Sequence, residues 1–162
     1  MVSAIDSRLK DVVSEKQRRD TEALRIYRPY GGQIEFHQSG ASEKVIRGGK
    51  RSGKTVAAVL EFASVATGQT IIGHDGKPIE RHMRMPDPDD PLLMWVIGWG
   101  LSHIGQTLYR KLFEPGLGSN MRAIRDLETR EWRAFNPSDP ADAERHDESV
   151  VVGPAIPSRF ID

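Results

Sequence analysis

Glycine, lysine and threonine stand at the fixed spacing of a phosphate-binding loop in residues 48–55, whose sequence is GGKRSGKT. This run matches the pattern G-x-x-x-x-G-K-[ST] at every fixed position. Gly48 and Gly53 permit positive φ angles and leave no Cβ in the path of a phosphate. Backbone N–H groups can then converge on anionic oxygens, aided by the positive end of the following helix. The pattern therefore predicts binding of a nucleoside triphosphate.

Two side chains of the loop have chemistry suited to that ligand. The Lys54 ammonium can reach the β- and γ-phosphates, and the Thr55 hydroxyl can ligate Mg²⁺. Each charge-assisted hydrogen bond contributes roughly 1.5–3 kcal/mol. A few such bonds are enough for micromolar affinity, so ATP with Mg²⁺ is the expected ligand.

A glutamine upstream of the loop suggests how the base is recognised. Gln33 lies 15 residues before Gly48, in a loop that is marked by Pro29 and two glycines. A side-chain amide offers one donor and one acceptor, which suits the N6 and N7 edge of adenine. Tyr27 or Tyr30 could stack on the ring. The predicted nucleotide-binding residues are thus Gln33, Gly48, Gly49, Ser52, Gly53, Lys54 and Thr55.

The elements around the loop predict an α/β fold. Residues 44–47 form a short β-branched run, and residues 55–66 have a helical composition with mixed three- and four-residue apolar spacing. A continuous apolar run at 92–98 is typical of a strand buried on both faces, and 102–113 predicts a helix. This order of strand, helix, strand and helix, together with the loop, predicts the α/β fold of a P-loop NTPase, a parallel sheet flanked by helices. We expect the domain to be incomplete.

The remaining segments have weaker patterns. Residues 5–22 predict a charged helix with one narrow apolar stripe, so residues 1–26 form an N-terminal helical segment ahead of a partial ATPase domain at 27–162. A hairpin is expected around Asp75 and Gly76. Residues 124–135 could be a hairpin or a helix, since periodicity does not decide between them.

Three further expectations concern the end of the chain and the long connection. Residues 136–148 read as an acidic loop and 150–152 as a short strand. His74, Asp75 and His82, in the connection at 67–91, read as surface residues because their spacing shows no convergent metal ligands.

Composition limits the function classes. The chain has 162 residues and no cysteine, which excludes disulfides and thiol nucleophiles. It contains no run of 18 apolar residues and no signal peptide, so we expect no membrane contact and a cytoplasmic location. Lys and Arg equal Asp and Glu at 23 each, whereas DNA-binding proteins usually carry a basic excess. Contact with DNA would require a local patch or another part of the protein.

P-loop ATPases need an apolar strand that ends in an acid, the Walker B element. The runs 92–98 and 150–152 end without one, and the acid after residues 160–161 follows too short a run. There is also no carboxylate cluster typical of a two-metal nuclease. We therefore expect this chain to bind ATP, to turn it over negligibly and not to cut DNA.

Several runs of the chain resemble the large subunit of tailed-phage terminases. They are residues 27–39, which include YRPY and the glutamine, residues 47–58 around the phosphate-binding loop, and residues 105–113 and 156–161. The resemblance implies the N-terminal ATPase part of a motor that drives double-stranded DNA into a procapsid. Partners would be the small terminase subunit, the portal and further copies of this chain, in the cytoplasm of a bacterial host. Walker B, the coupling motif and the nuclease domain have no counterpart here.

The resemblance also assigns roles to single residues. Gln33 becomes the adenine-side residue, Lys54 the phosphate lysine and Thr55 the magnesium ligand. Family members often carry a basic residue within the loop as an arginine finger, and Lys50 and Arg51 both qualify. The expected catalytic set is thus Lys54, Arg51 and Lys50. Two alternatives stay open: another P-loop NTPase, such as a helicase or small-molecule kinase, and a non-catalytic nucleotide-binding remnant.

Overall fold

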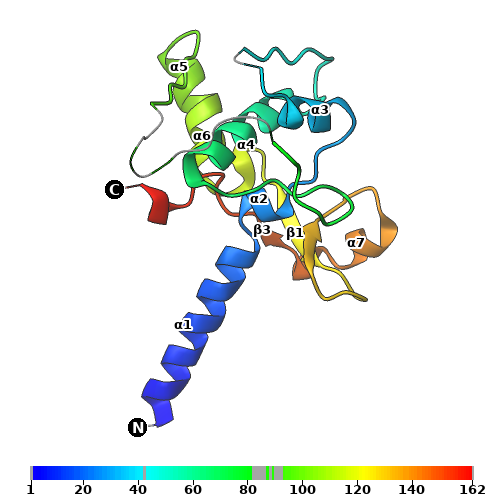
Figure 1. Cartoon of the computed structure of the whole chain (residues 1–162). Helices are drawn as coiled ribbons and strands as arrows, with labels where there is room; N and C mark the ends of the chain where they lie inside the picture. The colour runs from blue at the N-terminus through cyan, green and yellow to red at the C-terminus, as the bar shows by residue number, and fades with distance from the viewer. Residues whose placement is uncertain (1, 42, 82–86, 88, 90–92, 162) are drawn as a thin grey trace.

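The computed structural model describes residues 2–41, 43–81, 87, 89 and 93–161. It combines helices with a small antiparallel sheet, which confirms an α/β protein in the broad sense. A long N-terminal helix projects away from a body in which the other elements gather (Figure 1).

The projecting helix is α1 (Val2–Asp20), close to the predicted span. Charged pairs one turn apart support it: Glu15 accepts hydrogen bonds from the Nε atoms of Arg18 and Arg19, each at 2.7 Å. Its apolar residues Val12 and Val13 are exposed. The described part of α1 is thus a solvated helix, stabilised by its own charges more than by packing.

Two short helices precede the loop at residues 48–55. These are α2 (Ala23–Ile26) and α3 (Gly32–Gln38). The irregular stretch between them is shorter than predicted, because α3 begins at Gly32. Gln33 therefore lies in the first turn of a helix, where its position is more fixed than in a loop.

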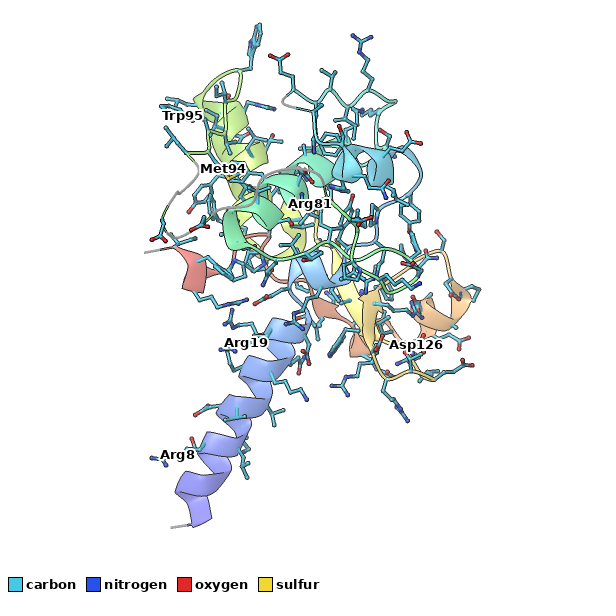
Figure 2. All side chains as sticks on the ribbon, viewed as in Figure 1. Arg8, Arg19, Arg81, Met94, Trp95 and Asp126 are labelled. Carbon is cyan, nitrogen blue, oxygen red and sulfur yellow. The ribbon has the colours of Figure 1, made fainter. Side chains whose placement is uncertain are left out.

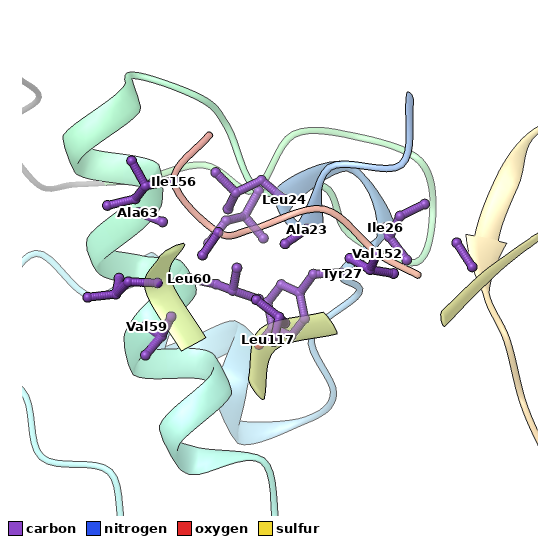
Figure 3. Packing of buried hydrophobic residues seen from close by; sticks show 14 of the residues in the cluster. Ala23, Leu24, Ile26, Tyr27, Val59, Leu60, Ala63, Leu117, Val152 and Ile156 are labelled. Carbon is purple, nitrogen blue, oxygen red and sulfur yellow. The ribbon is translucent and has the colours of Figure 1, made fainter. Parts of the chain in front are cut away.

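The central helix is α4 (Lys54–Thr67), which confirms the predicted helix after the loop. Gly53 before it and Gly68 after it both adopt left-handed backbone angles, with φ of 76° and 68°. Figure 3 shows side chains of α4 packed against α2 and the segment that carries Val152 and Ile156. The core residues on or near these elements are Ala23, Leu24, Ile26, Tyr27, Val59, Leu60, Ala63, Leu112, Leu117, Val152 and Ile156.

The second predicted helix is also confirmed, and its middle section is a π-helix. The helical stretch runs through α5 (Leu101–His103), the π-helical segment η1 (Ile104–Tyr109) and α6 (Arg110–Phe113). A 3₁₀ turn, η2 (Pro115–Gly118), follows at the predicted stop. Leu112 of α6 is buried in the core beside α4, so this helix is fixed at its C-terminal end.

The sheet contains three strands in the order β2-β1-β3: β1 (Arg122–Arg125), β2 (Trp132–Ala134) and β3 (Val150–Val151). Both pairings are antiparallel, with Ala123 opposite Ala134 on one side and Val150 on the other. For residues 124–135 the sequence left a hairpin and a helix open, and the antiparallel pairing of β1 with β2 shows that they form a hairpin. The short strand expected at 150–152 is confirmed by β3.

The acidic stretch before β3 is not the plain loop that its composition suggested. It forms α7 (Pro140–Glu144) and the 3₁₀ turn η3 (His146–Glu148), and η4 (Ser158–Phe160) follows near the end. Asp139 caps α7 by accepting the Ala141 N–H at 3.0 Å. An N-cap carboxylate followed by proline is a helix start signal that the acidic composition obscured.

The two strands predicted for a parallel sheet are not formed. Residues 44–49 and 93–98 have no regular secondary structure, and Leu92 lies outside the described residues. The side chains of Leu93, Trp95 and Ile97 are 83, 74 and 83% exposed, and Trp95 stands at the outer side of the molecule beside α5 (Figure 2). The prediction of a buried strand there is wrong for this structure. A strand forms only where a neighbour pairs with its N–H and C=O groups.

The connection after α4 contains the predicted small hairpin. Ile72 bridges Pro78 in antiparallel fashion, and the Gly73 N–H donates to the Lys77 carbonyl at 2.8 Å. His74 and Asp75 are exposed there, and His82 lies outside the described residues. No helix in the described part of the chain has both the length and the apolar character to cross a membrane.

Candidate functional site

The loop at residues 48–55, predicted to bind phosphate, is held in a tight conformation at its two fixed glycines. Gly53 has a φ of 76°, and a Cβ there would lie 2.6 Å from Gln33 Nε2. Gly48 does not have the positive φ expected of it; a Cβ would instead lie 2.8 Å from the Ser52 Oγ. Arg51 takes the second left-handed position, with a φ of 65°. The backbone angle thus favours glycine at position 53, whereas at position 48 a Cβ would require the Ser52 side chain to move.

The Lys54 ammonium lies within the curve of the loop. It donates to the carbonyl oxygens of Gly48 at 2.8 Å and Gly49 at 2.6 Å, and it is 3.2 Å from the Ser52 Oγ. The charge therefore stands where a phosphate held by the loop would need it. The first N–H groups of α4 have no partner within the helix, which adds donors at the same end.

Gln33 is bound directly to the loop, across 19 residues of sequence. Its Nε2 donates to the Ser52 carbonyl at 3.3 Å, and its Oε1 accepts the Tyr30 backbone N–H at 3.0 Å. The Tyr27 hydroxyl lies 3.2 Å from the same Oε1. The structure thus brings the predicted base-side residue and the predicted phosphate-side residues together.

An open cavity of about 910 Å³ lies between α3 and the loop. Its size is at the upper end of the roughly 300–1,000 Å³ that is common for small-molecule sites. The basic side chains of its lining are Arg28, Lys44, Arg47, Arg51 and Lys54, and the acidic ones are Glu35 and Glu43. This excess of positive charge suits a polyanionic ligand. Tyr27 and Tyr30 line the cavity too; Tyr30 is exposed, whereas Tyr27 is buried and hydrogen-bonded.

The predicted site residues divide into two groups by their position. Gln33, Gly48, Arg51, Ser52, Gly53 and Lys54 line the cavity. Gly49, Lys50 and Thr55 are not part of its described lining. Between the two arginine-finger candidates, Arg51 therefore faces the cavity and Lys50 does not. Thr55 lies exposed in the first turn of α4, and its role as a magnesium ligand stays a prediction.

A buried hydrogen-bond chain beneath the cavity was not predicted. The Tyr27 hydroxyl is 3.1 Å from His37 Nε2, and His37 Nδ1 is 2.7 Å from Glu61 Oε2 on α4. His37 has no exposed surface, and Tyr27 and Glu61 are buried. The sequence carried one signal for it: Glu61 interrupts an apolar run on a helix expected to be buried, and a buried acid requires partners.

Glu61 has further partners that keep it ionised. Lys44 Nζ donates to its Oε1 at 2.9 Å, and Arg81 pairs with its Oε2. Burial by itself would raise the pKa of Glu61, but the hydrogen bonds from His37 and Lys44, with the charges of Arg81 and Lys44, lower it to about 2. The side chain is therefore a carboxylate at neutral pH and accepts the His37 Nδ1 proton.

The aspartates that could supply a missing catalytic acid are engaged elsewhere. Asp142 is fully buried and forms a two-bond pair with Arg133, at 2.6 and 2.7 Å. Asp126 follows β1, where its Oδ1 accepts the N–H groups of Glu128 and Thr129 at 3.0 Å each. These bonds to Arg133 and to the turn amides lower the pKa of both carboxyl groups. Both side chains hold the hairpin, and Asp162 lies outside the described residues.

No group of three or more His, Asp or Glu side chains within the described ranges could hold a metal ion. Comparison of the chain with models of protein families, with curated proteins and with solved structures found no match to any of them.

Proposed function

We propose that this chain binds ATP with Mg²⁺ through the loop at residues 48–55. One observation carries the proposal: Gln33 is hydrogen-bonded to the loop at Ser52, at the edge of a basic cavity that Lys54 also lines. A residue suited to the adenine edge and a residue suited to phosphates thus line one cavity.

The donor set fits a triphosphate. The left-handed backbone at Gly53 gives the loop its turn, and the absence of a Cβ at Gly48 and Gly53 lets the Ser52 hydroxyl and the Gln33 amide lie against it. Lys54 and Arg51 supply positive charge, and the loop amides with the start of α4 supply N–H donors. A bound Mg²⁺ would neutralise phosphate charge, with Thr55 as the ligand that the loop pattern offers.

We further propose that the chain is the ATP-binding part of a DNA-packaging terminase motor. The support is the resemblance of residues 27–39, 47–58, 105–113 and 156–161 to the large subunit of tailed-phage terminases. Double-stranded DNA, a small terminase subunit, a portal and further copies of this chain are the partners that such a role implies, in the cytoplasm of a bacterial host.

The parallel sheet of P-loop NTPases belongs to this proposal as well. Residues 44–47 include the β-branched pair Val45 and Ile46, and 93–98 is an apolar run; neither stretch has regular secondary structure, and most of 93–98 is exposed. Pairing of these runs in the assembled motor would bury Leu93, Trp95 and Ile97, which are otherwise unusual on a surface.

A second candidate is a non-catalytic nucleotide-binding module. It is favoured by the engagement of Asp126 and Asp142 with Arg133, which leaves neither carboxylate available for magnesium or water. In that case ATP binding would change the conformation or the partners of the chain, without turnover.

Calorimetric titration of the 162-residue chain with Mg-ATP tests the binding proposal, with Gln33→Ala and Gln38→Ala as a matched pair on α3. We expect micromolar binding that weakens in Gln33→Ala and is retained in Gln38→Ala, whose side chain is exposed and does not line the cavity. Absence of binding by the wild type would overturn the proposal. Repeating the titration and a phosphate-release assay with double-stranded DNA separates the motor, which should respond to DNA, from the binding module, which should not.

A further inference from the structure

The Gln33 amide has a limited hydrogen-bonding capacity, and most of it is already used. A side-chain amide has two N–H donors and two lone pairs on its oxygen. Nε2 gives one proton to the Ser52 carbonyl, and Oε1 receives one from the Tyr30 N–H. One donor and one acceptor site remain, and the Tyr27 hydroxyl is positioned to take that acceptor site.

Discrimination between adenine and guanine depends on that last acceptor site. Both bases present an acceptor at N7, which the remaining Gln33 N–H can satisfy. They differ at position 6, where adenine presents an N–H donor and guanine an oxygen acceptor. A free lone pair on Oε1 therefore attracts adenine and repels guanine, whereas a lone pair occupied by the Tyr27 proton favours neither base.

The Tyr27 proton has two possible acceptors at almost equal distance. Gln33 Oε1 lies 3.2 Å from the hydroxyl oxygen, and His37 Nε2 lies 3.1 Å from it. The hydroxyl has a single proton, so it can donate to one of them at a time. The tautomer of His37 decides which.

Glu61 fixes that tautomer. Its carboxylate accepts from His37 Nδ1 at 2.7 Å, so a ring proton is on Nδ1. In this tautomer Nε2 carries no proton, so it can accept the proton of the Tyr27 hydroxyl, 3.1 Å away. The rings of Tyr27 and Phe36 pack edge-on against the imidazole.

We propose that His37, oriented by Glu61, draws the Tyr27 hydroxyl proton away from Gln33 and so makes the cavity prefer adenine over guanine. This proposal rests on the proposed function, because it concerns the base of the same nucleotide. His37, Glu61 and Tyr27 act as positioning residues here, since their effect passes through Gln33.

The structure assigns opposite effects to two variants of the same hydrogen bond. In His37→Leu the Tyr27 proton has only Gln33 Oε1 left, so the last lone pair is occupied and the ATP:GTP preference falls. In Tyr27→Phe no proton reaches that lone pair, so the preference stays at the wild-type value or rises. The double variant Tyr27→Phe/His37→Leu regains the preference that His37→Leu alone loses. A merely structural role for the pair would make the double variant the worst of the three.

The experiment is a titration of the full chain and its variants with Mg-ATP and Mg-GTP, with the ratio of the two dissociation constants as the readout. We expect His37→Leu to lower this ratio by about three- to tenfold, the effect of one neutral hydrogen bond, and Tyr27→Phe to leave it undiminished. His37→Gln, whose amide oxygen can also accept the Tyr27 proton, is the conservative variant and should retain most of the preference.

The outcomes separate this proposal from the proposed function. If the wild type binds neither nucleotide, the proposed function is wrong and this inference falls with it. If ATP binds and the ratio is the same in wild type and His37→Leu, or the double variant fails to recover the preference, the inference is wrong and nucleotide binding stands. Should His37→Leu fail to fold, His37→Phe, which keeps a ring and offers no acceptor, takes its place: a fall in its ratio that Tyr27→Phe does not show supports the proposal, and an unchanged ratio overturns it.

Discussion

Lys54 is the side chain whose removal should change ligand binding most. Its ammonium is held by the Gly48 and Gly49 carbonyl oxygens, so it is already placed inside the loop before a phosphate arrives. Lys54→Ala removes charge-assisted hydrogen bonds that contribute roughly 1.5–3 kcal/mol each, which corresponds to a loss of about 100-fold in ATP affinity.

Thermal unfolding with and without ligand converts this loss into a measured shift. With ATP at 100 times the wild-type dissociation constant, binding stabilises the folded state by about 2.7 kcal/mol. For a chain of this size that raises the melting temperature by about 5–11 °C. In Lys54→Ala the same ATP concentration would equal the dissociation constant and add about 0.4 kcal/mol, or about 1–2 °C. Each shift is taken against the same variant without ATP, so any effect of the lost loop bonds on stability cancels.

Lys50→Ala is the matched control, because Lys50 is in the same loop, carries the same charge and does not line the cavity. It should keep most of the wild-type shift. Equal shifts in Lys54→Ala and the wild type would refute the assignment of Lys54 to the phosphates. Equal losses in both variants would mean that the loop acts only through its overall charge.

Three further predictions follow from the same geometry. Gly53→Ala should weaken Mg-ATP binding and lower the free energy of unfolding by about 1 kcal/mol or more, because a Cβ at φ 76° would lie 2.6 Å from Gln33 Nε2. In the control Gly49→Ala the new Cβ has no atom within 4 Å, so the free energy of unfolding should hardly change. Equal losses of stability in the two variants would contradict the argument from strain at Gly53. The Glu61 pKa is lower in the folded chain, about 2 against 4.5, so its contribution to stability is present above about pH 4.5 and is lost as the pH falls towards 2. Urea unfolding between pH 3 and pH 7 should show that the free energy of unfolding rises with pH in the wild type and rises less in Glu61→Gln. The variant should also be less stable at pH 7 by roughly 3–5 kcal/mol. If the free energies of the two proteins change with pH in parallel, Glu61 is not the group responsible. Steady-state phosphate release from the chain should stay at the level of Lys54→Ala, and turnover near one per second that is lost in Lys54→Ala would reveal a catalytic carboxylate that we have missed.

Local patterns were sufficient for the elements whose bonds lie within a short stretch of chain. The charged helix α1, the helix α4 after the loop and the helical stretch 101–113 follow from spacing, caps and breakers. The phosphate-binding role of Lys54 also comes from a local pattern, and it stays a prediction. In each case the partners are a few residues apart, so the sequence contains the whole interaction.

Predictions that needed distant partners were less successful. The runs at 44–47 and 93–98 have strand-like composition, yet neither forms a strand, because a strand needs a neighbour that composition does not provide. At 124–135 the sequence left a hairpin and a helix open, and the pairing of β1 with β2 and β3 decided for the hairpin. The parallel sheet remains part of the proposed function.

The candidate site shows the same division. The sequence alone predicted a phosphate-binding loop at residues 48–55, the residues that belong to it and the suitability of Gln33 for a base. Only the tertiary structure placed Gln33 on Ser52, separated Arg51 from Lys50, and joined Tyr27, His37 and Glu61 beneath the cavity. The physical reason is that a loop motif encodes its own backbone geometry, whereas contacts between residues 19 to 24 positions apart depend on how α3 packs against α4.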